Sequence, residues 1–335
     1  MNRIAIATLA AAALAGGCKK QASAPPAALT GLGAVPASAE VVVAIDVRRV
    51  IDAPLVARAV SELLVRDSVL ANSWAKVQDA CKLDVGASIK RVMLAIGPHT
   101  GAQPGTGPVL LIATGKLVET ELAGCIRAMV GQGGGSLTAR PLGTRTLYEA
   151  KDGNRVMFFA FGTPDTVLMS ASEPYITEAL GDGKKLPDNP DMAKWIALAN
   201  QQAPIWAAGR ADERVRQGMV KVAGGQITSG PVAYTASLDP TGGVKLEVDA
   251  VMATPADAKT LESFAKTQLG ALGMVAQAKS LGTIVDKVSI SADGAVLRLR
   301  AALDLDEVNQ VISVLDGGGG SAQDAPPQGS GSQGK

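Results

Sequence analysis

Strict alternation between apolar and charged residues is the feature of this sequence that most limits its fold. Residues 244–252 read VKLEVDAVM, and residues 296–301 read VLRLRA. Because successive side chains of a strand point to opposite faces, the pattern predicts strands with one face on helices and the other in water. Strands of this kind are typical of antiparallel sheets. The expected fold class is therefore α+β with largely antiparallel sheets, rather than a doubly wound parallel sheet.

The folded body is predicted to consist of two similar halves, residues 37–202 and 203–316. Each half is expected to read strand, helix, strand, strand, helix, strand, strand, helix, which contains the split βαβ or ferredoxin-like order. The helices that follow the paired strands begin VETELAGCIRAM at Val118 and PADAKTLESFAK at Pro255. Identity between the halves is too low to establish a duplication, so the internal repeat is a hypothesis.

Three helix starts carry recognisable capping residues. Ser172 precedes a short apolar-periodic segment, and Asn189-Pro190 combines an N-cap residue with proline at the first helical position. Residues 254–257, TPAD, add an acid in the first turn, where a negative charge is favourable. These segments predict helices that begin at about residues 173, 190 and 255.

Composition excludes several classes of partner. Apolar residues make up 47% of the chain, enough for a sizeable core, whereas aromatic residues make up only 3%. So few rings argue against a base-stacking surface or a sugar platform, because both need exposed aromatic side chains. Residues 1–17 contain one basic residue, Arg3, and the rest of the chain holds 31 basic and 31 acidic residues. A body without net charge does not attract nucleic acid, so no nucleic-acid partner is expected.

The aromatic residues are interpreted as core. Phe158, Phe159 and Phe161 lie in one short apolar run, and runs of this kind are usually buried strands. Trp74, Trp195 and Trp206 also lie within apolar patterns. The alternative interpretation of the phenylalanines is the lining of an apolar pocket.

The first 17 residues have the composition of an export signal. Arg3 gives a positive start, and Ile4–Leu14 is an apolar run shorter than the roughly 20 residues of a membrane-spanning helix. The segment then ends LAGGC at Cys18, which resembles the lipobox of bacterial lipoproteins, with Ala15 where leucine is commonest. The resemblance implies cleavage before Cys18 and a diacylglycerol on its sulfur, which would make the membrane a partner. An ordinary signal peptide with a chance cysteine is the alternative.

The lipoprotein resemblance also implies a location. Lys19 follows the cysteine, in place of the aspartate that retains lipoproteins at the inner membrane, so the outer membrane of the cell envelope is implied. Residues 18–36 are rich in Ala, Pro and Ser and are expected to form a disordered tether. Residues 317–335 are rich in Gly, Ser, Pro and Gln and are expected to form a disordered tail.

The sequence contains no motif for catalysis or metal binding. The single histidine, His99, lies in a loop rich in Gly and Pro and is interpreted as a solvated turn residue. With two cysteines in the body, it cannot complete a structural zinc site. Neither a G-x-S-x-G elbow nor a G-x-x-x-x-G-K-[ST] phosphate loop occurs. We therefore expect no enzyme activity, no cofactor and no bound metal.

Two cysteines remain once Cys18 is lipidated, namely Cys81 and Cys125. Export places them in an oxidising compartment, where paired thiols tend to form disulfides. Both lie on apolar stripes of predicted helices that flank the same pair of strands, so a disulfide between them is expected. The alternative is two separate buried thiols.

Three functional hypotheses follow. The first is a lipid-anchored cell-envelope protein with a non-catalytic role in binding or scaffolding, whose partner is another envelope protein. The second is a carrier of an apolar ligand or lipid at the membrane, which accords with the high aliphatic and low aromatic content. The third is an envelope hydrolase, although no catalytic motif supports it.

The lipobox interpretation gives the first prediction. Replacement of Cys18 with Ala should abolish incorporation of labelled palmitate and release the protein to the soluble fraction, because the acylated sulfur would be the anchor. Cell fractionation with metabolic labelling measures both. A Cys18→Ala protein that partitions wholly with membranes and still carries label would refute the anchor.

Overall fold

The computed structural model describes residues 29–81, 85–99, 106–163, 165–278 and 281–317. Cys18, the expected signal peptide and most of the expected tail lie outside the described residues. Residues 29–36 were expected to belong to the tether, but the structure packs them into the body. Leu29, Ala34 and Val35 are buried there, because this segment is apolar enough to join the core.

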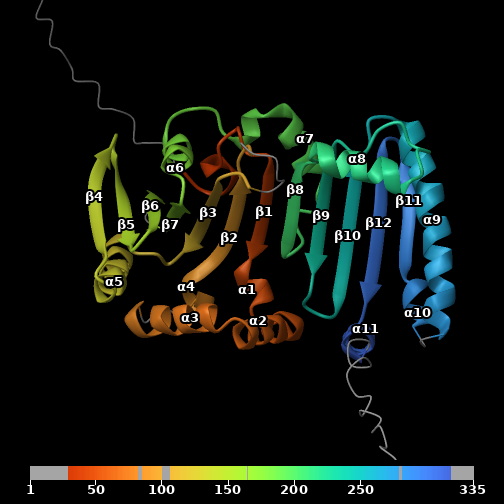
Figure 1. Ribbon diagram of the computed structural model, residues 1–335. Coiled ribbons are helices and arrows are strands. Elements are labelled where there is room, and N and C mark those ends of the chain that lie inside the picture. The colour runs from red at the N-terminus through yellow and green to blue at the C-terminus, as the bar shows by residue number, and fades with distance from the viewer. Residues whose placement is uncertain (1–28, 82–84, 100–105, 164, 279–280, 318–335) are drawn as a thin grey trace, which may run out of the picture.

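The described strands form a single sheet of 12 strands (Figure 1). In sequence, they are β1 (Val41–Asp46), β2 (Ile89–Ile96), β3 (Val109–Gly115), β4 (Ser136–Leu142), β5 (Arg145–Asp152), β6 (Arg155–Thr163), β7 (Thr166–Ser170), β8 (Ile205–Arg210), β9 (Ala233–Asp239), β10 (Val244–Val251), β11 (Val288–Asp293) and β12 (Val296–Leu303). Their order across the sheet is β11-β12-β10-β9-β8-β1-β2-β3-β7-β6-β5-β4.

The helices connect these strands or cover them. They are α1 (Val47–Val50), α2 (Pro54–Arg66), α3 (Ser68–Cys81), α4 (Val85–Ser88), α5 (Glu119–Gln132), α6 (Glu173–Leu180), α7 (Pro190–Leu198), α8 (Glu213–Val222), α9 (Pro255–Ala278), α10 (Gly282–Val285) and α11 (Leu305–Gly317). The α+β class and the antiparallel sheet are confirmed, since each pairing between the described strands is antiparallel.

The ferredoxin-like order expected for each half is not confirmed. That order needs the strands before and after the first helix to run parallel, with a third strand between them. Instead, β1 pairs directly with β2 and β8 pairs directly with β9, both antiparallel. A split arrangement occurs only later in the second half, where β12 lies between β10 and β11, the two strands that α9 connects. Local patterns predicted the elements, whereas pairing depends on contacts far apart in sequence.

The two halves meet at the pairing of β1 with β8 and share one core. Outward from this seam, the first half runs β1-β2-β3-β7-β6 and the second runs β8-β9-β10-β12-β11, with the hairpin β5-β4 added to the first. The largest buried cluster includes Val42 and Ile176 from the first half and Trp206 and Val251 from the second. The sheet and its main core are therefore continuous across the boundary at residue 203.

Each face of the sheet is covered only in part. On one face, α6 and α7 bury alternate side chains of the central strands, including Val42, Ala44, Trp206 and Ala208. We call this the α7 face. On the opposite face, which we call the α9 face, α5 packs on β3, β5, β6 and β7, and α9 packs on β10, β11 and β12. The helix layers are thus offset from one another.

Most aromatic residues behave as expected, with one exception. Phe158, Phe159 and Phe161 are buried, as are Trp195 and Trp206. The expectation that Trp74 lies in the core is wrong, because its side chain on α3 is 37% exposed. Both α2 and α3 lie at one end of the sheet, where no strand covers them (Figure 1). The apolar periodicity of these segments correctly indicated helices, but it did not indicate burial, since α2 has no buried residue.

Asp257 fixes the start of α9. Its carboxylate accepts hydrogen bonds from the Thr228 backbone N–H at 2.7 Å and from the Thr254 hydroxyl at 2.9 Å, and its own N–H donates to Thr254 Oγ1 at 3.1 Å. The backbone hydrogen bond from Thr228 is the main cause that lowers the pKa of this carboxyl below its ordinary 3.8. The bonds tie the helix to the loop before β9, as the capping pattern of residues 254–257 indicated.

This network predicts how stability depends on pH. Because the pKa is lower in the folded protein, the carboxylate stabilises the fold above pH 3.8, and this contribution is lost as pH falls through the lower folded value. Asp257→Asn should lower the free energy of unfolding at neutral pH by about 2 kcal/mol, since charge-assisted hydrogen bonds are lost. It should also flatten the decline of the melting temperature below pH 4.

Thermal melts between pH 2 and 7 measure both effects. Asp191→Asn is the matched control, because Asp191 is an exposed acid in the first turn of α7. Equal acid sensitivity of the wild type and the Asp257→Asn protein would show that the network contributes nothing.

Cys81 and Cys125 lie at disulfide distance, with 5.0 Å between their Cα atoms. Cys81 ends α3 and Cys125 lies within α5, where it is buried. The Cys81 sulfur also contacts Met129 Sδ of α5 at 3.9 Å. Since α2 buries no side chain and α3 is largely exposed, the cysteine pair matters because it attaches α3 to α5, which packs on the sheet.

The cysteine pair predicts a redox-dependent stability. Reduction should lower the free energy of unfolding by about 4 kcal/mol, the loop-closure contribution expected for a sequence separation of 44 residues. Thiol labelling of denatured, unreduced mature protein should find no reactive thiol at these two positions. Two reactive thiols per chain would contradict the bridge. The double variant Cys81→Ser, Cys125→Ser should lose its sensitivity to reductant.

Candidate functional site

At the centre of the α9 face lie apolar side chains that do not belong to any of the buried hydrophobic clusters of the described residues. We call this surface the apolar floor. Its middle row runs Leu94, Val43, Ala207, Ala236 and Val248 across five neighbouring strands, in register. The whole floor consists of Val41, Val43, Ile45, Leu94, Ile96, Ile205, Ala207, Ala236, Leu238, Leu246 and Val248, each of them only partly buried. A sheet face of this kind normally packs against another layer.

Helices surround the apolar floor without crossing it. Figure 1 shows α5 at the β4–β5 side of the sheet, α9 at the β11 side, and β1, β8, β9 and β10 between them. In the same view, α8 crosses the upper ends of β9 and β10, and α2 lies below the lower ends of the strands. Arg58 of α2 reaches Asn309 of α11 at 3.4 Å, which links the helices at the lower end. From β2 to β10, the floor is about 19 Å wide at a strand spacing of about 4.8 Å.

Exposed aliphatic side chains occur on the helices around the floor. They are Val60 and Leu63 on α2, Val215 and Val222 on α8, and Leu272, Met274 and Val275 on α9. Single exposed apolar residues are common on protein surfaces, so these side chains alone do not mark a site. None of the described helices is long and apolar enough to cross a bilayer.

One end of the floor opens into a pocket of about 550 Å³ beneath α8. The floor residues Val41 and Ile96 line it together with Tyr234. Its charged lining residues are the acids Glu40, Asp212 and Glu213 and the arginines Arg210 and Arg216. Burial raises the pKa of the Tyr234 hydroxyl, so this group is neutral. The pocket thus joins an apolar surface to a group of charges, and we call it the α8 pocket.

Glycine at position 209 lets β8 approach β1 closely at this end of the sheet. An added Cβ there would lie 2.8 Å from Val41 Cγ2 and 3.0 Å from the Glu40 carbonyl oxygen. These distances are shorter than ordinary contacts, so any larger residue would push β8 away from β1. The seam between the halves can close at this end because residue 209 has no side chain.

His99 is an exposed loop residue, as the sequence indicated, but its ring also lies between two carboxylates. Its Nδ1 lies 3.3 Å from a Glu40 carboxylate oxygen and its Nε2 lies 3.4 Å from an Asp212 carboxylate oxygen. Glu40 precedes β1 and Asp212 caps α8, so the imidazole links the two halves at the wall of the α8 pocket. The loop composition gave no sign of these contacts, since both partners are distant in sequence.

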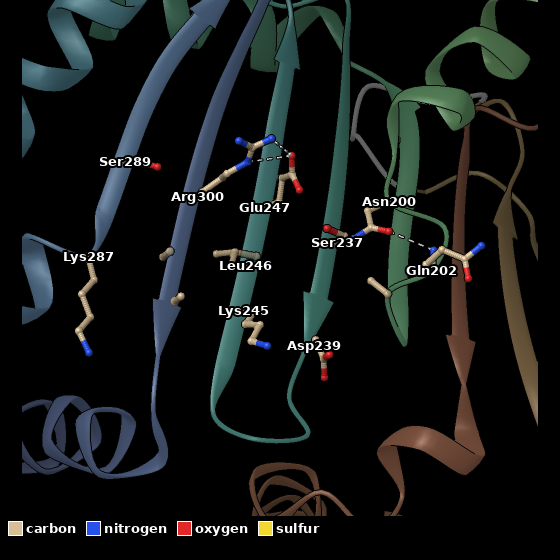
Figure 2. Close-up of a pocket in the computed structure, with 13 residues that line it drawn as sticks. Asn200, Gln202, Ser237, Asp239, Lys245, Leu246, Glu247, Lys287, Ser289 and Arg300 are labelled. Carbon is tan, nitrogen blue, oxygen red and sulfur yellow. Dashed lines mark hydrogen bonds and ion pairs between the residues drawn. The ribbon is translucent and has the colours of Figure 1, made fainter.

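The α7 face of the second half carries a polar pocket of about 480 Å³. Figure 2 shows Glu247 on β10 facing Arg300 on β12; the Arg300 Nε and Nη2 donate to Glu247 Oε1 at 3.1 and 2.8 Å. Lys287 pairs with Glu307 at 2.5 Å. Since its main charges are paired within the protein, this pocket is better explained as a solvated sheet face than as a ligand site.

Asp249 is the one acidic residue buried on this polar face beside an arginine. It is 3% exposed, and burial raises the pKa of its carboxyl, while Arg298 lies 4.0 Å away. Arg298 also pairs with Asp293 at 3.1 Å. The alternating charges of residues 244–252 and 296–301 thus form cross-strand pairs.

The structure therefore supports some predicted sites and adds one. Cys81 and Cys125 come together, and Cys18 lies outside the described residues. Among the described residues, no group of three His, Cys, Asp or Glu side chains is arranged to hold a metal ion. The apolar floor was not predicted, because the apolar run Val41–Asp46 does not show which of its faces is covered. Comparison of the chain with protein-family models, curated proteins and solved structures finds no match.

Proposed function

We propose that the protein is a lipid-anchored, non-catalytic binding protein of the bacterial cell envelope, and that the apolar floor is its binding surface. The observation that carries the proposal is the row of partly buried aliphatic side chains on five adjacent strands, with no described helix over it. Anchoring through Cys18, export and the outer-membrane location rest on the lipobox resemblance.

Physical chemistry supports an occupant for the floor. Apolar surface that leaves water contributes about 25 cal/mol per Å², so an occupant that covers about 300 Å² would gain roughly 7 kcal/mol before its ordering costs. Large uncovered apolar patches on soluble bodies are typical of interaction sites. On the opposite face of β10, Glu247 pairs with Arg300 of β12, so this floor strand has one apolar and one charged side.

Site-specific photo-cross-linking tests this proposal in living cells. A photoreactive residue in place of Ala207 lies in the middle of the floor, and the same residue in place of Ala302 lies on the polar face of β12. Light should give an adduct at position 207 that is absent at position 302, detected by intact-protein mass spectrometry. Identical adduct patterns at both positions, or no adduct at position 207, would contradict the proposal.

A further inference from the structure

We propose that a second copy of this chain binds at the outer edge of β11, where the two copies of β11 pair antiparallel about a two-fold axis. β11 is an outermost strand of the sheet and pairs only with β12 (Figure 1). Its outer edge forms no backbone hydrogen bond with any residue that the structure describes. An edge of this kind is a template for another strand. The inference does not depend on what occupies the apolar floor.

The two edges of the sheet differ in their protection against pairing. At the opposite edge, β4 carries Arg140 and Pro141 within the strand. Proline lacks the N–H that a ladder of hydrogen bonds needs, and charges on an edge discourage pairing. From Val288 to Ala292, β11 contains neither proline nor a charged residue, and it pairs with β12 without a bulge. β11 is therefore the edge that can accept a strand.

The edge segment from Lys287 to Asp293, KVSISAD, is chemically symmetric about Ile290. Side chains directly opposite one another in an antiparallel pair lie on the same face of the sheet. Pairing of two copies about Ile290 therefore sets Lys287 of each copy opposite Asp293 of the other, and Ser289 opposite Ser291. Figure 2 shows Lys287 and Ser289 on the outermost strand of the α7 face. On this face, each charge thus meets its opposite and serine meets serine.

Both charged groups have capacity for this second partner. Within the chain, Lys287 pairs with Glu307 and Asp293 pairs with Arg298. An ammonium has three donors and a carboxylate has two acceptor oxygens, so one ion pair does not saturate either group. The Asp293 side chain is 70% exposed and the Lys287 side chain is 41% exposed. Opposite charges across an antiparallel pair stabilise it.

The α9 face of the edge fits the same register. Ile290 lies opposite Ile290 of the second copy, and Val288 lies opposite Ala292, so apolar side chains meet where each copy already packs them under α9. A shift of the centre by one residue, to Ser289, would instead set Asp286 opposite Ala292. Charge and apolar pattern therefore select the register about Ile290.

The helix layer leaves room for the second copy. α9 packs on β10, β11 and β12, so its axis lies inside the edge of the sheet. At a strand spacing of about 4.8 Å, the two α9 axes would be separated by about 10 Å or more across the two-fold axis, which packed helices allow. Because that axis is perpendicular to the sheet, the apolar floors of both copies face the same side.

Sedimentation velocity of the purified chain tests the inference. The protein used is the polypeptide from Lys19 to Lys335, which keeps every described residue and lacks Cys18. We expect a monomer–dimer equilibrium with a micromolar dissociation constant, since a short strand edge makes a small interface.

Charge reversal locates the interface. Lys287→Asp and Asp293→Lys each set like charges opposite one another and should weaken the dimer about tenfold. The double variant Lys287→Asp, Asp293→Lys restores opposite charges and should recover most of the affinity. Each single variant also disturbs an ion pair within the chain, so recovery in the double variant is the deciding result. Arg140→Asp, at the β4 edge, is the control and should leave the equilibrium unchanged.

Cysteine cross-linking measures the register without changing a charge. Because Ser289 lies opposite Ser291 of the second copy, a mixture of Ser289→Cys and Ser291→Cys proteins should oxidise to a covalent dimer. Neither variant alone should do so, since its new cysteine faces a serine. Non-reducing electrophoresis detects the product.

Three results would overturn the inference. They are a wild-type chain that stays monomeric at high micromolar concentration, single charge variants that dimerise as strongly as the wild type, and a cysteine mixture that cross-links no better than each variant alone. The photo-cross-linking test at position 207 does not involve β11, so the proposed function and this inference can fail separately.

Discussion

The antiparallel pairing of β1 with β8 is the contact on which the rest of the structure depends. It joins two halves that would otherwise each end in an unpaired strand edge, and it runs in register from Val41–Gly209 to Ile45–Ile205. Because the pairing is central, side chains of both halves enter one core on the α7 face. The same pairing places the apolar side chains of both strands side by side on the α9 face, where they form the middle of the apolar floor.

The path of the chain explains why this face is left uncovered. After its third strand, each half forms a helix, α5 or α9, that leads outward to a hairpin at the edge of the sheet. Each helix therefore packs over the outer strands of its own half. The helices between the first two strands of each half do not cover the centre either, since α2 and α8 have no buried residue. The floor is therefore a consequence of topology.

The sequence predicted what depends on neighbouring residues. Ser172 and Asn189 cap α6 and α7 as expected, with bonds to the backbone N–H groups of Tyr175 and Met192. Alternation identified β10 and β12 and the polar side of each. Strand order could not be predicted, because nothing local in Val41–Asp46 shows that it pairs with β8. The same run is apolar on both sides, so its sequence does not distinguish an open face from a buried one. Only the tertiary arrangement shows that Val43 is partly open while Val42 is buried.

The start of the described chain connects the anchor proposal with the floor. Leu29 is buried against the sheet, and its carbonyl lies where a Cβ of Gly162 would be, so the chain is fixed to the body from this residue onward. Between Cys18 and Leu29 lie 11 peptide steps, which span at most about 40 Å at roughly 3.6 Å each. A body tethered this closely to a bilayer meets a high local concentration of lipid, which strengthens binding by effective concentration rather than by new contacts. Under the anchor proposal, a modest affinity of the floor for an occupant at the same membrane is therefore sufficient.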